Sequence, residues 1–301
     1  MNVVIVGAGA IGLLIGSFLS EQKHEITYIT RTAEQADNLR KSGVTLVQTN
    51  GKKVHSHVDA FVEYGLAPTN ALWIIAVKYH HLQGIEEKLH SLPLTTPLLF
   101  IQNGIAHLQW INQLQQEQIY IATIEHGAIK DNATTIIHKG IGLTKISPYK
   151  MTTNTPLDMT ILQSPKFQIE LVEDAHAIVL RKAILNACIN PLTTILLIEN
   201  GKLISNNHAY QLMQSLFVEM QTTFPEITAM LTFDDVIALC EKTKTNKSSM
   251  LQDRLNERQS EIEPIVGALL NLATARGKEL PLLQTLYQLV LAIDEKGETH
   301  E

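Results

Sequence analysis

The stretch NVVIVGAGAIG, residues 2–12, decides how this chain of 301 residues begins to fold. A run of β-branched residues leads directly into Gly7, Gly9 and Gly12, and a helix-like segment follows them. A second β-branched run, HEITYIT at 24–30, comes next. Strand, G-x-G-x-x-G, helix and strand in this order predict a dinucleotide-binding βαβ unit, whereas the glycine motif alone would be weak evidence.

Each glycine of the motif has a predicted task. Gly7 allows a tight turn, Gly9 lets the backbone approach a pyrophosphate, and Gly12 lets helix and strand pack closely. The helix N-terminus then offers free N–H groups and a positive dipole to the phosphates. The predicted cofactor-binding loop therefore comprises Gly7, Ala8, Gly9, Ala10, Ile11 and Gly12. A glycine-rich turn without a ligand is the alternative, and the order of the flanking elements argues against it.

Composition limits the class of protein. The chain is 45% hydrophobic and 18% charged, as in a globular protein, and its net charge of −6 argues against nucleic-acid binding. Its only cysteines, Cys188 and Cys240, exclude a disulfide framework and fit the reducing cytoplasm. The uncharged run from Val3 to Ser20 has the length of a short membrane span, but its four glycines fit the βαβ unit better. No basic residue precedes the run, which argues against a secretory signal.

The rest of the chain changes character near residue 171. Buried-looking runs at 71–77 and 97–102 predict further parallel strands, and runs at 119–125, 134–140 and 141–147, with the turn KDN between the first two, predict a closing meander. After residue 172 we expect amphipathic helices only, over 174–198, 206–222, 233–243, 249–258, 261–276 and 281–294. The predicted fold is α/β: an N-terminal Rossmann-type doubly wound parallel sheet over 1–171, then an all-α domain over 172–301.

The end of the second strand indicates which nucleotide binds. An NAD site places an acidic residue there, but this chain has Thr30 and Arg31. The planar guanidinium of Arg31 suits a 2′-phosphate, so the sequence favours NADP. Lys78 follows the strand at 71–77 and adds a cation at the same sheet edge. Either residue could instead be an ordinary surface cation, and their joint placement at strand ends favours the phosphate site.

Asn103, in the run IQNGI, closes the strand at 97–102 at this edge. We expect it to contact substrate or cofactor, although Asn-Gly is also a common turn dipeptide.

A column of polar residues marks the first predicted helix of the second domain. In LRKAILNACINP, residues 180–191, Lys182, Asn186 and Asn190 recur every four positions, just before Pro191 should end or kink the helix. A solvated face is the simple explanation, but such faces usually carry more charges. The column therefore predicts donors and acceptors aimed at a small polar ligand.

Ser249, Ser260 and Glu261 have a structural explanation on local sequence alone. SMLQ at 249–252 and SEIE at 260–263 match the capping box, so both serines are predicted to start helices, with Glu261 in a first turn. The twelve histidines, including the pairs His55/His57 and His80/His81, form no compact metal pattern, and we predict no metal site.

Taken together, the chain resembles the ketopantoate reductase (2-dehydropantoate 2-reductase) family over essentially its full length. The resemblance rests on GAGAIG with Arg31, AVKYHHL, FIQNGI, RKAILNACINPLT, ENGKL and SSMLQDRLNERQSEIE. It implies NADPH-dependent reduction of ketopantoate to pantoate in pantothenate biosynthesis, in the cytoplasm, in a cleft between the two domains. The implied partner is the small substrate alone, with no nucleic acid and no membrane, in a monomer or homodimer.

The resemblance also assigns roles. Lys182 is implied as the catalytic general acid and Glu261 as the carboxylate beside it. The positions implied to contact substrate are Asn103, Lys182, Asn186, Asn190, Asn200, Ser249 and Glu261. The cofactor positions are the glycine loop, Arg31, Lys78 and Asn103. One departure is the sequence Ile262–Glu263, where the family often has Ile-Asp, and it leaves the catalytic position intact.

These residue types suit hydride transfer to the C2 carbonyl of a 2-oxo acid. An ammonium at Lys182 can stabilise the charge that grows on the carbonyl oxygen and then donate the proton, and Glu261 can keep that lysine protonated. Two other functions remain open on sequence alone. One is an NADP-linked reductase of another 2-oxo or 3-hydroxy acid, and the other is a non-catalytic NADP(H) sensor, which would have no need of a proton donor.

Overall fold

The computed structural model describes residues 1–298 and divides into two compact units. The first unit comprises Met1–Gln102 and Ile111–Ala175. The second comprises Asn103–Trp110 and the chain from His176 onward. The segment Asn103–Trp110 thus groups with the second unit, although the chain before and after it belongs to the first. A single domain boundary along the sequence cannot describe this grouping.

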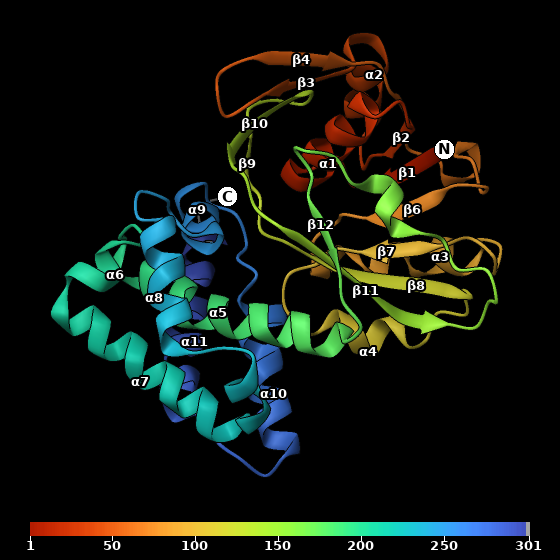
Figure 1. The fold of residues 1–301 in the computed structure, drawn as a ribbon. Helices are drawn as coiled ribbons and strands as arrows, with labels where there is room; N and C mark the ends of the chain where they lie inside the picture. The colour runs from red at the N-terminus through yellow and green to blue at the C-terminus, as the bar shows by residue number, and fades with distance from the viewer. Residues whose placement is uncertain (299–301) are drawn as a thin grey trace. The chain divides into compact units, whose positions relative to one another are not determined.

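An eight-stranded sheet forms the centre of the first unit (Figure 1). Its spatial order is β12-β11-β8-β7-β6-β1-β2-β5, and every neighbouring pair is parallel except β8 with β11. The strands are β1 (Asn2–Val6), β2 (Glu25–Ile29), β5 (Asp59–Phe61), β6 (Leu72–Ile75), β7 (Leu98–Phe100), β8 (Gln118–Ile124), β11 (Thr144–Met151) and β12 (Ile169–Leu171). The central strands β6, β7 and β8 are buried at every position, as expected for a sheet covered on both faces.

The predicted closing meander is wrong. The run at 134–140 forms β10 (Thr135–Gly140), which leaves the main sheet and joins a second sheet in the order β4-β3-β10-β9. Its partners are β3 (Val44–Val47), β4 (Lys53–Ser56) and β9 (Gly127–Lys130). The physical difference lies in periodicity: β8 is buried throughout, whereas β10 is fully buried only at Ile136 and His138. That alternation marks a strand with one covered face.

The helices of the first unit explain the apolar run after the glycine motif. They are α1 (Ala10–Glu21), α2 (Ala33–Ser42) and α3 (Glu86–His90), and α4 (His107–Ile111) spans the junction of the two units. Short 3₁₀ turns of this unit are Tyr64–Leu66, Tyr79–His81, Gln83–Ile85 and Met159–Leu162. α1 contacts strands of both sheets, so every residue from Gly12 to Leu19 is buried. No helix among residues 1–298 is long and apolar enough to cross a membrane.

The second unit is helical, as predicted. Its helices are α5 (Ala175–Leu196), α6 (Lys202–Ser205), α7 (Asn207–Thr223), α8 (Phe233–Lys242), α9 (Ser249–Leu255), α10 (Ala268–Ala275) and α11 (Pro281–Glu298). A 3₁₀ turn covers Pro225–Ala229, and a π-helical turn at Glu263–Gly267 leads into α10. The short α6 escaped the sequence prediction because four residues carry no helical period. Cys188 and Cys240 are both free and buried in the core of this unit.

Candidate functional site

The glycine loop of the first unit has the shape that a dinucleotide requires. Gly7 has φ +107°, and a Cβ there would lie 3.0 Å from the backbone of Ala76 and Val77. A Cβ on Gly12 would lie 2.1 Å from the Gly7 carbonyl oxygen, so only glycine allows α1 to approach this closely. A Cβ on Gly9 would meet nothing within 4 Å. The loop is therefore packed where protein meets protein and open where a diphosphate would approach, which fits a nicotinamide dinucleotide.

Basic residues gather at the neighbouring strand ends. Ile29 of β2, Val6 of β1 and Ile75 of β6 lie side by side in register, and the chain reaches Arg31 and Lys78 within three residues of this row. Burial, together with the charges of Arg31 and Lys78, lowers the pKa of His81. Arg31, Lys78 and His81 thus share one electrostatic environment, which a phosphate dianion would fit. In the sequence, His81 is considered only as a metal ligand, in the pair His80/His81, and its place beside Arg31 and Lys78 is not predicted.

In the second unit, the turn after Gln102 brings two predicted site residues together. The Asn103 amide Nδ2 donates a hydrogen bond to Oε2 of Glu261, 3.0 Å away, across 158 positions of sequence. Glu261 is buried, with 9% of its surface exposed. Gly104 has φ +80° and lies against Pro264, whose carbonyl oxygen accepts from the Ile105 N–H at 3.0 Å. Asn103 and Gly104 therefore form a structural turn, and this turn directs the Asn103 side chain to Glu261.

The polar column lies on α5, which continues through Pro191 to Leu196. Between positions 183 and 194 every residue is buried except Asn186, which is half-buried like Lys182 one turn earlier. Asn190 is 4% exposed, and its Nδ2 has no hydrogen-bond partner among residues 1–298. The column is thus a polar strip on a helix that is otherwise buried between positions 183 and 194, and the explanation as an ordinary solvated face does not apply to Asn190.

A buried histidine near Lys182 gave no signal in the sequence. His107, on α4, is 0% exposed. Burial, followed by the charge of Lys182, lowers its pKa to about 4, so the ring is neutral near pH 7. From the sequence alone, a histidine among apolar residues is interpreted as a core residue. Only the fold shows that His107 lies close enough to Lys182 for the lysine charge to affect its pKa.

The start of α9 corrects the prediction for Ser249. The N-cap is Ser248, whose buried Oγ accepts from the Leu251 N–H at 3.1 Å and lies 2.8 Å from Oγ1 of Thr193 on α5. Ser249 is the first helical residue and is exposed. Because two serines are consecutive, the sequence left open which of them caps the helix. The structure assigns the cap to Ser248, which also contacts Thr193. Ser249 is therefore not needed as the cap.

Ser260 does not start a helix as predicted: the helical segment begins at Ile262, and the predicted capping box is not formed. The Oγ of Ser260 accepts from the Ile262 N–H at 3.3 Å and donates to Oδ2 of Asp294 at 2.6 Å. Glu263, which a capping box would direct back to Ser260, instead accepts from the hydroxyl of Tyr287. The π-helical turn that begins at Glu263 changes the spacing that the motif assumes.

Asn200 lies in the connection between α5 and α6. Its Nδ2 donates to Oγ1 of Thr243 at 2.9 Å, and its backbone N–H donates to the carbonyl of Asn246 at 2.9 Å. Its Oδ1 is buried and has no hydrogen-bond partner within the described chain. The segment Thr243–Ser248 therefore ties Asn200 to the start of α9, the element that carries Ser249.

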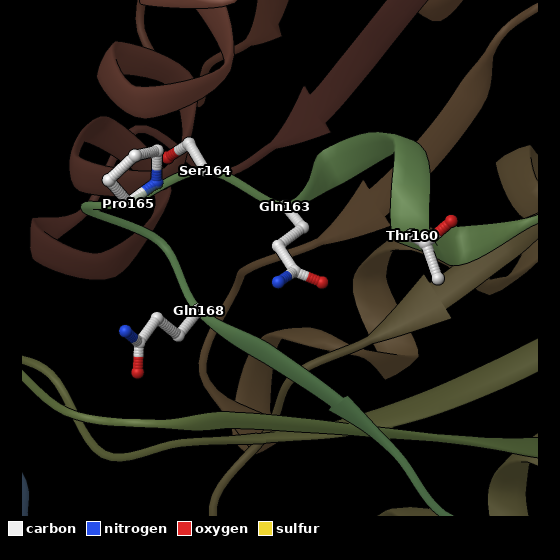
Figure 2. A pocket seen from close by; sticks show the side chains of 5 residues that line it. All are labelled: Thr160, Gln163, Ser164, Pro165 and Gln168. Carbon is white, nitrogen blue, oxygen red and sulfur yellow. The ribbon is translucent and has the colours of Figure 1, made fainter.

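Two further features are separate from these residues. A shallow depression of about 450 Å³ is lined by Thr160, Gln163, Ser164, Pro165 and Gln168 in the connection from β11 to β12, and it contains none of the predicted site residues (Figure 2). Its lining side chains carry no charge. Residues 1–298 contain no group of three His, Cys, Asp or Glu side chains that could hold a metal ion.

Comparisons with known proteins match most of the chain to one family. The family profile described as Ketopantoate reductase PanE/ApbA matches residues 3–151, and its C-terminal counterpart matches 174–294. The 2-dehydropantoate 2-reductase of Listeria innocua is 37% identical over 302 aligned positions, covering 100% of this chain and 98% of the relative. The crystal structure of a probable 2-dehydropantoate 2-reductase from Bacillus subtilis superposes with a TM-score of 0.83 at 30% identity, covering 97% of this chain and 100% of that one.

A second solved structure shares the fold at lower identity. D-mandelate dehydrogenase, in a ternary structure with NADH and anilino(oxo)acetate, superposes with a TM-score of 0.87 at 24% identity over 99% of this chain and all of that one. At this identity the likeness concerns the fold alone.

Proposed function

The chain belongs to the ketopantoate reductase family, and from this we propose that it reduces 2-dehydropantoate to pantoate with NADPH. The observation that carries the proposal is the pairing of Asn103 with the buried Glu261 in the unit that also bears the polar column of α5. Bound NADPH supplies the hydride. The chain's own residues bind the oxo acid, orient it and deliver a proton.

Each group of the second unit has a proposed task. The Lys182 ammonium stabilises the negative charge that develops on the carbonyl oxygen and then transfers its proton to that atom. Glu261, held by Asn103, accepts from the substrate hydroxyl. Asn186, Asn190, Asn200 and Ser249 bind the hydroxyl and carboxylate without adding charge near the lysine. Asn190 Nδ2 and Asn200 Oδ1, which have no hydrogen-bond partner within residues 1–298, support this assignment because each offers a buried hydrogen bond to a ligand.

The proposed preference for NADPH rests on the basic residues at the strand ends. Arg31 and Lys78 are assigned to the 2′-phosphate, since both act electrostatically on His81 and no acidic residue occupies the end of β2. We place the enzyme in the cytoplasm, where two buried free thiols remain reduced.

A reductase of another 2-oxo acid is the second candidate, because the same fold and the same proton donor would serve it. Purified protein assayed for NADPH oxidation with ketopantoate and a panel of 2-oxo acids separates the two. The proposal requires the highest kcat/KM for ketopantoate. A different best substrate would replace it, and binding of NADPH without turnover on any substrate would favour a sensor.

Lys182→Met tests the proposed acid. Methionine retains most of the aliphatic stem, so NADPH affinity should be unchanged while single-turnover hydride transfer at saturating ketopantoate falls by roughly 10²–10⁴-fold. Lys278→Met, which removes the same charge from an exposed position of the second unit, is the control and should transfer hydride normally. Transfer at the wild-type rate by Lys182→Met would show that this lysine is not the acid.

A further inference from the structure

Lys130 is a basic residue at the glycine loop that the family motifs do not include. It ends β9, in the second sheet of the first unit, and its Nζ donates to the Ala8 carbonyl oxygen at 2.9 Å. Gln35 of α2 donates to the same oxygen at 2.9 Å and to the Ala133 carbonyl at 3.3 Å. The second sheet thus extends a cation to the residue between Gly7 and Gly9.

The ammonium of Lys130 retains donors that the protein does not use. A lysine ammonium has three N–H donors, and within residues 1–298 this one makes a single hydrogen bond and no ion pair. The adjacent carboxylate of Asp131 accepts instead from Asn132, at 3.3 Å. The Lys130 side chain is exposed overall, so a ligand can reach it. Partial desolvation of the ammonium against the loop lowers the pKa of Lys130.

The helix that follows Ala8 adds its positive N-terminal end to the loop that Lys130 contacts. α1 begins at Ala10, directly after Gly9, and its first turn contains no acidic residue to offset the helix dipole. Gly9 leaves open space where an anion would approach the helix N-terminus. A phosphate that approached Gly9 would therefore meet both the N-terminal end of α1 and the Lys130 ammonium.

We propose that Lys130 is a further cofactor-binding residue, which contacts a phosphate group of the dinucleotide while its Nζ also donates to the Ala8 carbonyl. This rests on the proposed use of NADPH. Two phosphate sources share the required chemistry: the diphosphate, common to NADPH and NADH, and the 2′-phosphate of NADPH. The bond to Ala8 keeps the long side chain ordered, so less conformational entropy is lost when the phosphate binds.

Titration of purified protein with NADPH and with NADH tests the proposal without any turnover. Lys130→Met should raise the Kd for NADPH about tenfold, the lower range for a charge-assisted hydrogen bond at an exposed site. Lys130→Arg should recover most of the affinity because it keeps the charge. Lys139→Met, which removes a lysine of equal charge from the exposed face of β10, is the matched control and should leave the Kd unchanged.

The titrations distinguish a phosphate contact from simple support of the loop. Lys130→Gln can still donate to Ala8 but lacks charge, so it should bind NADPH as weakly as Lys130→Met. The difference in Kd for NADPH between wild type and Lys130→Met should also become smaller at 0.5 M NaCl, because salt screens the contact between the ammonium and the phosphate. An equal loss for NADH assigns the diphosphate, and a loss for NADPH alone assigns the 2′-phosphate.

Two results would overturn the proposal. One is an unchanged Kd for both cofactors in Lys130→Met, and the other is full affinity in Lys130→Gln, which would leave only a role in supporting the loop. If wild-type protein binds neither cofactor, the proposed function fails instead, so the two failures are distinguishable.

Discussion

Replacement of Gly104 by alanine should destabilise the second unit and disturb the site together. Gly104 has φ +80°, where an L-residue costs about 1–2 kcal/mol. An alanine Cβ would lie 1.9 Å from the Pro264 carbonyl oxygen and 2.4 Å from its carbonyl carbon, both backbone atoms that cannot rotate away. Relief of such a clash costs about 1–3 kcal/mol, so the total should be about 2–5 kcal/mol.

The chain provides a control for the clash. Gly277, after α10 in the same unit, has φ +65°, and a Cβ there would meet nothing within 4 Å. Gly277→Ala should therefore show only the backbone cost, about 1–2 kcal/mol. The difference between the two variants isolates the contact between Gly104 and Pro264.

Urea unfolding gives the free energies, and hydrogen exchange reports locally on the Ile105 N–H, which donates to Pro264. In Gly104→Ala this amide should exchange faster, and kcat/KM should fall because Asn103 no longer aligns with Glu261. Equal destabilisation of Gly104→Ala and Gly277→Ala, with unchanged exchange at Ile105, would refute the reasoning.

Three other predictions follow from single contacts. Arg31→Ala should weaken NADPH binding roughly ten- to a hundredfold and NADH binding little, and equal losses on titration would assign Arg31 to fold support. Ser248→Ala should lower the free energy of unfolding by about 1 kcal/mol because it removes the helix cap. Ser249→Ala should leave the melting point unchanged and raise KM for the oxo acid, and an unchanged KM would argue against contact with the ligand. Burial and the neighbouring His138 lower the pKa of His126 in the folded protein to about 4, so the unfolded chain binds a proton at higher pH than the folded one. The free energy of unfolding should therefore fall as the pH drops from about 6.5 towards 4, and urea titrations that show no change over this range would contradict the prediction.

The elements predicted best were those with a strong period or a motif whose parts constrain one another. The βαβ start was predictable because β-branched runs flank glycines at fixed spacing, and the structure supplies the close contacts that require them, as at Gly12. The α5 column was predictable because steps of four residues stay on one side of a helix. Both rest on local geometry that the sequence states directly.

The parts that escaped prediction depend on which strand or helix lies beside another. Whether the run at 134–140 continues the main sheet or joins β3 is decided by pairing over long sequence separations, which residue types do not encode. The same holds for the cap at Ser248, selected by Thr193 of α5, and for Lys130, which reaches Ala8 across 122 positions. A prediction from local pattern identifies candidates at such places and leaves their partners undetermined.

The energetics of two buried asparagines, Asn190 on α5 and Asn200 after it, support the proposed ligand site. An unpartnered polar atom in a buried position costs about 1–3 kcal/mol, and Asn190 Nδ2 and Asn200 Oδ1 each stand in that position among the described residues. Leucine at Asn190 would remove the cost and extend the apolar core that surrounds the helix. A substrate with a carboxylate and a hydroxyl supplies an acceptor for the amide N–H and a donor for the amide oxygen. Under the proposed function, an analogue that lacks either group would leave one of these atoms unpaired, and we therefore expect the two asparagines to discriminate among oxo acids.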